Sequence, residues 1–397
     1  MSARKLKIEP IDNKNQRGGV FAIIVTILLG LKFTLLQNVI SPVSYALLFI
    51  VAINTARLFF SDQRRKVSSL ALSFLVAGAL SLIATPFLNP VFRPTERYLL
   101  FLTMFIGYGP LLLSEKTSNF RLFVFNNIQL FFVIISLLSF ATYLLRIPIA
   151  FGRAGFNGIT PHPMDLSPIA AFSSLYSTNM YRECQNIKGK IVWALIILVS
   201  ITTMIIAASR GALVAFGVSV LFYFVNKNRG IGRSIRQIII TSALIIAVVA
   251  INPFSMMDNL ELKMERIEQT DDITGGRNQS FSKRYQEFES SPIFGVGFSS
   301  MTHNDIENGH FEPGSGWTFI LSSTGLFGLV TSLLLCVFAI MNVRKCSYLA
   351  LLSSTCLFFV IHSIIEGYIL TVSNGFCLYM WLVMGLSSDK SFLKKYV

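Results

Sequence analysis

Residues 191–225 read IVWALIILVSITTMIIAASRGALVAFGVSVLFYFV. Two apolar runs, 191–208 and 212–225, flank the small polar island Ser209-Arg210-Gly211. A helix needs ~20 apolar residues to cross the hydrocarbon core of a bilayer, so this stretch predicts two membrane spans joined by a tight turn. A cation this deep in apolar sequence costs at least ~2.5 kcal/mol, which makes Arg210 a candidate functional residue. The structural alternative is a turn arginine that reaches the membrane interface.

The rest of the chain shares this apolar character. Of its 397 residues, 53% are hydrophobic and 14% are charged, and its mean hydropathy is +0.61. Soluble domains carry about 25% charged residues. This composition excludes a disordered chain, a collagen-like repeat and a disulfide-stapled secreted scaffold. The sequence therefore predicts an all-α polytopic membrane protein.

The same length rule, applied along the chain, predicts about twelve transmembrane helices. They cover residues 19–36, 42–60, 67–85, 98–113, 122–145, 168–181, 191–208, 212–225, 238–252, 317–341, 348–365 and 369–386. We divide the chain into three parts. Residues 1–252 contain transmembrane helices 1–9, residues 253–316 form one large outer loop with amphipathic helices, and residues 317–397 contain helices 10–12 and a cytoplasmic tail.

The net charge of +14 comes from 34 Lys and Arg against 20 Asp and Glu. Most of the basic residues fall in the loops on the same side as the N-terminus. The positive-inside rule makes that side cytoplasmic and predicts that both termini lie there. The charge therefore indicates membrane orientation, and we expect no nucleic-acid partner. The five cysteines show neither a disulfide framework nor metal-ligand spacing.

The long outer loop contains two predicted helices. Met257, Leu260, Met264 and Ile267 have the spacing of an amphipathic helix that lies along a membrane surface. A second helix is predicted to begin near Arg277 and to end at Ser290-Ser291-Pro292. Two arginines and two aromatics fall on one face of it: Arg277, Phe281, Arg284 and Phe288.

The side chains on this face suit a glycan that is carried on a phosphate. Guanidinium groups match phosphate oxygens, and aromatic rings stack on sugar faces. The alternative is an amphipathic helix whose arginines reach lipid headgroups. Three of the four histidines, His162, His303 and His310, also fall in outer loops, where histidine suits proton removal near neutral pH. His362 lies near Glu366 and favours a packed polar pair.

Three motifs resemble those of the O-antigen polymerase and ligase superfamily, polytopic enzymes that handle lipid-linked glycans on the outer face of the bacterial inner membrane. They are Ser209-Arg210-Gly211-Ala212, then Gly276-Arg277 followed by Pro292-Ile293-Phe294-Gly295-Val296-Gly297, and finally Gly325-Leu326-Phe327-Gly328. The resemblance implies a GT-C-like architecture with a large periplasmic loop. It also implies metal-independent glycosyl transfer without a cofactor, from a glycan joined to undecaprenyl pyrophosphate.

The resemblance also implies roles for residues of this chain. Arg210 and Arg277 would bind the pyrophosphate, Arg284 would assist, and His303 or His310 would be the base. Fixed positive charge aimed at a leaving group is a large catalytic contribution. We further predict substrate-binding roles for Arg153, His162, Phe281, Phe288, Gly295 and Gly297. The expected partners are the lipid-linked oligosaccharide, membrane lipid, and a chain-length regulator and flippase of the same pathway.

The resemblance leaves three functions to compare. Ligases of this superfamily tend to carry His-Asn about ten residues before the Gly-x-x-Gly of the span, where this chain has Gly314-Ser315-Gly316-Trp317. We therefore prefer a polymerase that joins repeat units into O-antigen or a related surface polysaccharide. The alternative is an O-antigen ligase or a protein O-oligosaccharyltransferase. A polysaccharide transporter or flippase ranks lower, because mid-span charges are few and no repeat is visible.

Overall fold

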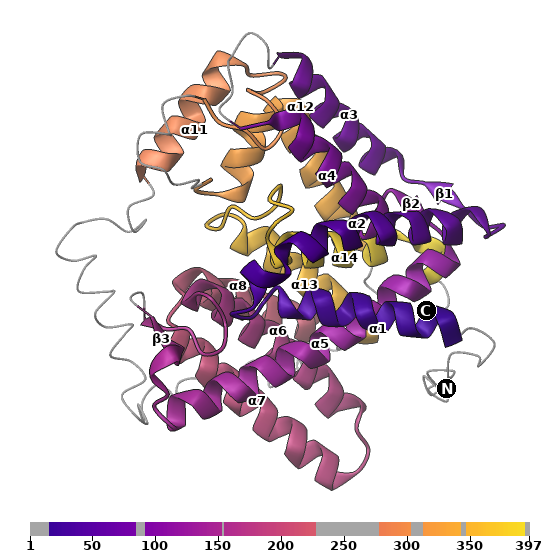
Figure 1. The fold of residues 1–397 in the computed structure, drawn as a ribbon. Helices are drawn as coiled ribbons and strands as arrows, with labels where there is room; N and C mark the ends of the chain where they lie inside the picture. The colour runs from indigo at the N-terminus through magenta and orange to yellow at the C-terminus, as the bar shows by residue number, and fades with distance from the viewer. Residues whose placement is uncertain are drawn as a thin grey trace.

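The structure is a computed structural model that describes residues 16–84, 92–152, 155–227, 278–302, 313–342 and 347–393. It is mostly helical (Figure 1). The helices are α1 Gln16–Leu31, α2 Gln37–Phe60, α3 Ser69–Ala84, α4 Pro94–Gly107, α5 Glu115–Leu144, α6 Pro163–Glu183, α7 Ile187–Ala207, α8 Arg210–Lys227, α11 Asn278–Ser290, α12 Gly316–Asn342, α13 Ser347–His362, α14 Gly375–Ser388 and α15 Lys390–Leu393.

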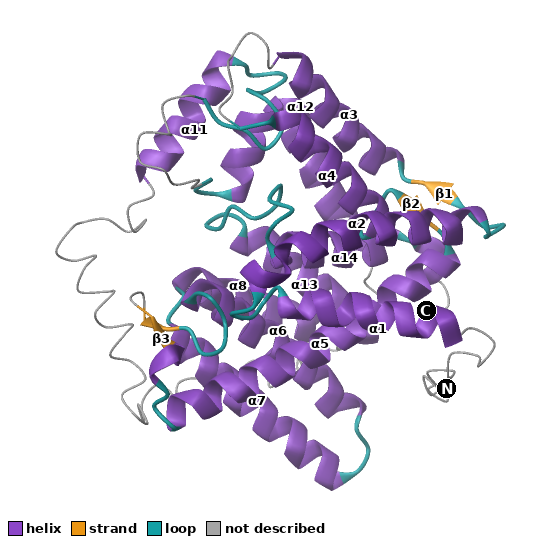
Figure 2. Ribbon diagram, viewed as in Figure 1, coloured by secondary structure: helices purple, strands orange, loops and turns teal. Residues whose placement is uncertain are grey.

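Four short strands form two separate antiparallel pairs. Strand β1 Lys66–Val67 pairs with β2 Leu112–Leu113, and β3 Phe151–Gly152 pairs with β4 Gly155–Phe156. Figure 2 shows β3 and the β1–β2 pair at opposite edges of the helical body. These strands fasten loops at the ends of helices and form no layer of their own.

Four helices, α2, α5, α7 and α12, are long and apolar enough to cross a membrane. Shorter apolar helices lie within α1, α3, α8, α13 and α14. The composition and these helices agree with the predicted all-α membrane protein. The count of twelve spans and the GT-C-like architecture stay predictions, and the ninth predicted span, 238–252, lies outside the described residues.

Two predicted spans have wrong boundaries, and local chemistry explains both. The predicted span 98–113 continues past the end of α4 at Gly107, because Pro110 has no N–H to extend a helix and the chain turns into β2. The predicted span 369–386 begins too early. Residues 363–374 form turns, and α14 begins only after Asn374, whose side chain accepts a hydrogen bond from Phe376 N at 2.7 Å.

The core is built around α14, which is buried on every side. Trp381 at its centre is fully buried, and its ring lies 4.8 Å from that of Phe105 and 5.7 Å from those of Phe74 and Phe101. A helix that is apolar all round belongs in the middle of a bundle, surrounded by others. Helices α5, α12 and α13 pack directly against it.

One set of contacts joins segments that the sequence predicts to be cytoplasmic. The ring of Phe21 in α1 stacks on that of Phe120 in α5. Lys116 donates its backbone N–H to Asp62 at 3.1 Å, which ties the end of α2 to the start of α5. Ser118 donates a hydrogen bond to Asp389 at 2.6 Å, which brings the end of α14 to the start of α5.

A second set of contacts joins segments that the sequence predicts to be outside. Leu35 N donates to Ile159 O at 3.1 Å, which links the turn after α1 to the loop after β4. Ser300 Oγ donates to Phe92 O, and the N–H of Gly316 donates to Ser363 O. These contacts therefore join predicted outer segments to one another and predicted cytoplasmic segments to one another within the described part of the chain. The side of a membrane that each set of contacts faces stays a prediction from charge.

Candidate functional site

Arg210 is the first residue of α8, where the chain breaks sharply between two helices. Ala208 ends α7 in the left-handed conformation, with φ of 52°, and Leu213 N donates to Ser209 O in the first turn of α8. The Arg210 side chain is partly buried and has no hydrogen-bond or ion-pair partner within the described part of the chain. A helix N-terminus carries partial positive charge and unpaired N–H groups. The two together suit an anion such as a phosphate.

The turn segment 363–374 packs directly against this position. A Cβ at Gly211 would lie 2.9 Å from the side chain of Ile365, so the glycine lets the segment come close to the start of α8. The backbone N–H of Gly316, at the start of α12, donates to Ser363 O at 2.9 Å and to Glu366 O at 3.1 Å. Three chain segments that are distant in the sequence therefore meet beside Arg210.

A pair of carboxyl groups lies in the same region. Burial, and to a lesser extent the charge of Glu366, raise the pKa of Asp165, in the first turn of α6, to about 7. A carboxyl group with a pKa near 7 exchanges protons readily at neutral pH, as a general base does. The sequence analysis missed this pair. The available signal was Glu366 itself, the only acid between 347 and 386.

The structure gives local roles to two histidines. His162 caps α6, where its Nδ1 accepts a hydrogen bond from Met164 N at 3.1 Å, and its ring is exposed close to the Asp165 turn. His362 is buried, with Nδ1 3.1 Å from Tyr368 Oη. The predicted substrate contact of His162 stays a prediction.

Helix α11 forms as predicted, and Arg284 lies in an ion pair on its buried face. Arg284 Nη1 is 2.6 Å from Glu287 Oε2, and both side chains are almost fully buried. Glu287 Oε1 in turn accepts hydrogen bonds from Thr302 N at 2.7 Å and from its hydroxyl at 3.1 Å. These bonds tie the helix to the loop after it. The guanidinium therefore has a structural task, and its predicted assistance to the pyrophosphate stays a prediction.

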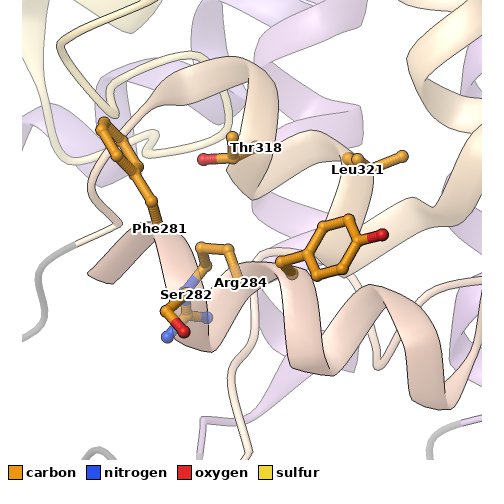
Figure 3. Close-up of a pocket in the computed structure, with 6 residues that line it drawn as sticks. Phe281, Ser282, Arg284, Thr318 and Leu321 are labelled. Carbon is orange, nitrogen blue, oxygen red and sulfur yellow. The ribbon is translucent and has the colours of Figure 1, made fainter. Parts of the chain in front are cut away.

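A cavity of about 450 Å³ separates α11 from the first turns of α12. Figure 3 shows Phe281 and Thr318 on its sides. Its lining residues are Phe281, Ser282, Arg284, Tyr285, Thr318 and Leu321. Phe288 lies one turn further along, with its ring 6.2 Å from that of Tyr285. The predicted aromatic face thus borders this cavity. Its contact with a sugar stays a prediction.

The glycines of two sequence motifs pack against each other. Helix α12 is broken at Gly325, where φ is 66° and ψ is −169°. The carbonyls of Ser322 and Ser323 then accept from the N–H groups of Val296 and Gly297, at 2.8 and 3.3 Å. Leu326 N donates to Pro292 O at 2.8 Å. The loop at 292–297 therefore completes the hydrogen bonds that the break leaves open.

Both motif glycines at this junction lie at positions that exclude a side chain. A Cβ at Gly295 would lie 2.4 Å from the backbone of Ser323, and one at Gly325 would lie 2.1 Å from Ile293 O. Gly295 and Gly297 also have positive φ, 74° and 124°. These contacts explain the glycines structurally, and their predicted contact with substrate stays a prediction.

Residues 195–333 match a family model described as O-antigen ligase. Over that stretch the chain is similar to the O-antigen ligase family. The match spans both the α7–α8 break and the α12 junction, and it supports the resemblance to the polymerase and ligase superfamily. Members of this family are glycan-processing enzymes, which supports a reaction of glycosyl-transfer type. No curated protein matches the chain.

Four predicted site residues lie outside the described residues: Arg153, Arg277, His303 and His310. The remaining predicted residues divide into two groups. Arg210 and His162 lie near the carboxyl pair, at the start of α8 and of α6. The residues on α11 and the 292–297 loop lie on the other side of the α12 start, around the cavity and the glycine junction. Among the described residues, no three His, Cys, Asp or Glu side chains gather as a metal site.

Proposed function

We propose that the protein is a polymerase that joins undecaprenyl-pyrophosphate-linked oligosaccharide units into O-antigen or a related surface polysaccharide. The observation that carries this proposal is the position of Arg210 beside the 363–374 segment. The guanidinium at the positive end of α8 has no partner among the described residues, the neighbouring segment carries Glu366, and Glu366 acts electrostatically on Asp165. Arg210 thus supplies positive charge that can bind a phosphate, and the carboxyl groups supply a proton acceptor.

The proposed reaction needs both features. A hydroxyl of the acceptor sugar attacks the anomeric carbon of the donor glycan and forms a new C–O bond. The bond from that carbon to the pyrophosphate breaks, and the pyrophosphate leaves with the electron pair. Arg210 stabilises the charge that builds on the leaving group, and Arg277 is its predicted second contact. The hydroxyl proton passes to a carboxylate.

Asp165 is our preferred base, because its pKa near 7 allows it to be both deprotonated and effective at neutral pH. The predicted alternatives are His303 and His310. The proposed chemistry uses no cofactor and no metal. We further propose that it takes place on the outer face of the bacterial inner membrane, with both termini cytoplasmic, and in partnership with a chain-length regulator and a flippase.

The region before Gly325 supports a polymerase over a ligase. Ligases of the superfamily tend to carry His-Asn there, and this chain has Gly314-Ser315-Gly316-Trp317. Each of these positions is used for packing. Gly314 faces the ring of Phe281 with φ of 72°, Gly316 is bonded to the 363–366 turn, and Trp317 Nε1 donates to Val360 O at 2.9 Å.

The test is glycan analysis of a deletion strain that carries a plasmid copy of the gene. The wild-type copy should restore long chains, whereas Arg210→Ala should leave single repeat units. Arg65→Ala is the matched control, because Arg65 is an exposed arginine in a loop predicted to be cytoplasmic and should restore the full ladder.

Two outcomes would count against the proposal. A deletion strain with an unchanged chain-length ladder would exclude the polymerase. Loss of long glycan from lipid A core or from protein, while polymer on the carrier lipid persists, would establish the ligase or oligosaccharyltransferase alternative. Membrane levels of each variant, measured by immunoblot, separate loss of activity from loss of protein.

A further inference from the structure

A second cationic cluster lies around Lys32, away from Arg210. Lys32, in the turn between α1 and α2, is only 4% exposed. Its Nζ donates to Ser373 O at 3.2 Å and lies 5.6 Å from the centre of the Tyr45 ring. Within the described part of the chain, no carboxylate lies within ion-pair distance of this ammonium group. A buried cation without an acidic partner is unusual, because burial removes its hydration.

A second cation, Arg97, also lies near Tyr45. Arg97, at the start of α4, has its guanidinium 4.3 Å above the Phe92 ring and donates to Ser299 O at 2.6 Å. The hydroxyl of Tyr45 is close enough to Arg97 to act on it electrostatically. Tyr45 itself is partly exposed. Two positive charges therefore lie near one phenol hydroxyl, and Arg97 is partly exposed as Tyr45 is.

The 363–374 segment links this cluster to the Arg210 region. Ile365 packs on Gly211 beside Arg210. Further along the segment, Leu370 O accepts from Ser299 Oγ at 3.4 Å, and Ser373 O accepts from Lys32. In Figure 1 the gold loops between α8 and the α2–α4 pair belong to this part of the chain. The 363–374 segment therefore contacts the start of α8, beside Arg210, near its first residues and Lys32 near its last residues.

The chemistry of polymerisation calls for two phosphate sites. The donor gives up its pyrophosphate, whereas an acceptor that is itself lipid-linked keeps its own throughout the reaction. Both pyrophosphates must be held while the sugars meet. A single arginine site cannot hold the two together, because they repel each other.

We propose that Lys32 and Arg97, with the Tyr45 hydroxyl, bind the pyrophosphate of the acceptor's carrier lipid, while Arg210 binds that of the donor. This inference rests on the proposed function. Lys32 supplies a compact charge held in place by Ser373, and Arg97 supplies a planar fork that matches phosphate oxygens. The 363–374 segment separates the two sites, and its carboxylate Glu366 lies near the Arg210 end.

The test counts bound lipids by native mass spectrometry on the full-length protein in detergent, with undecaprenyl pyrophosphate as the probe. The wild type should bind two molecules. Lys32→Met, Arg97→Gln and Arg210→Ala should each bind one, and the Lys32→Met/Arg210→Ala double variant should bind none. Arg93→Ala is the matched control and should bind two, because Arg93 lies near Arg97 but is exposed and paired with Glu96.

The one molecule retained by Lys32→Met or Arg97→Gln also shows that the variant has folded. Binding of a single molecule by the wild type would overturn the inference, and so would binding of two by both Lys32→Met and Arg97→Gln. Displacement of the second molecule by phosphatidylglycerol would also overturn it, because the cluster would then be a general lipid headgroup site. This count does not depend on polymer formation, so a failure of the proposed function in the deletion strain is distinguishable from a failure here.

Discussion

Replacement of Gly325 by alanine tests the junction between α12 and the 292–297 loop. The new Cβ would lie 2.1 Å from Ile293 O and 2.3 Å from its carbonyl carbon, and both are backbone atoms that cannot rotate away. The backbone at this position, with φ of 66° and ψ of −169°, lies in a region that only glycine adopts readily. The substitution therefore combines backbone strain with a steric overlap.

The magnitude follows from these two contributions. A side chain in this conformational region costs of order 1–3 kcal/mol. Forcing an additional methyl group into a packed interior costs about 1–3 kcal/mol more. We expect a loss of about 2–6 kcal/mol in the free energy of unfolding, which corresponds to a fall of about 2–7 °C in the unfolding midpoint for a chain of 397 residues with ~2.1 cal/mol/K of unfolding entropy per residue.

The assay is thermal unfolding of the detergent-solubilised protein, followed by tryptophan fluorescence. Trp317 lies in α12 two turns before the break and reports on it directly. Gly217→Ala in α8 is the matched control, since no atom lies within 4 Å of its Cβ position and its φ is not positive. That change should leave the midpoint unchanged or raise it slightly. Equal midpoints for Gly325→Ala and Gly217→Ala would refute the proposed junction.

Three further predictions concern the site. If Asp165 is the base, polymerisation in vitro should rise about tenfold between pH 6 and pH 8, because a carboxyl with pKa about 7 is mainly protonated below that pH. Asp165→Asn should abolish that rise, and persistence of the same profile would exclude Asp165. Arg210→Ala should lower the rate about 10²–10³-fold, and a rate within threefold of wild type would exclude its role. Glu287→Gln should cost about 3–5 kcal/mol in thermal unfolding, because it removes the carboxylate that is ion-paired with buried Arg284, whereas exposed Glu289→Gln should cost nothing.

The sequence was sufficient to predict the helices that have long apolar runs or regular helical spacing. The apolar runs gave helices, and α11 begins and ends within one residue of its predicted bounds because its spacing and the following Pro292 are local signals. The α12 span was predicted equally well. The errors fall where turn chemistry overrides apolar composition, at Pro110 and Asn374.

The candidate site was only partly predictable. Arg210 could be identified because a charge within an apolar stretch is visible in the sequence alone. The proximity of Asp165 to Glu366 could not be predicted, because the two acids are 201 positions apart in the sequence and only packing brings them together. Likewise, Gly295 and Gly297 were predicted to contact substrate, and only the structure shows that their loop packs against the break in α12 at Gly325.

The sequence by itself predicted a helical membrane protein that resembles the glycan polymerase and ligase superfamily, and it singled out Arg210 as a candidate functional residue. Hydropathy, charge bias and short motifs act over a few residues, so they can be read without coordinates. Only the tertiary structure decided which loops lie together. That choice depends on side-chain packing and hydrogen bonds between segments such as Lys32 and Ser373, and no local pattern encodes such contacts.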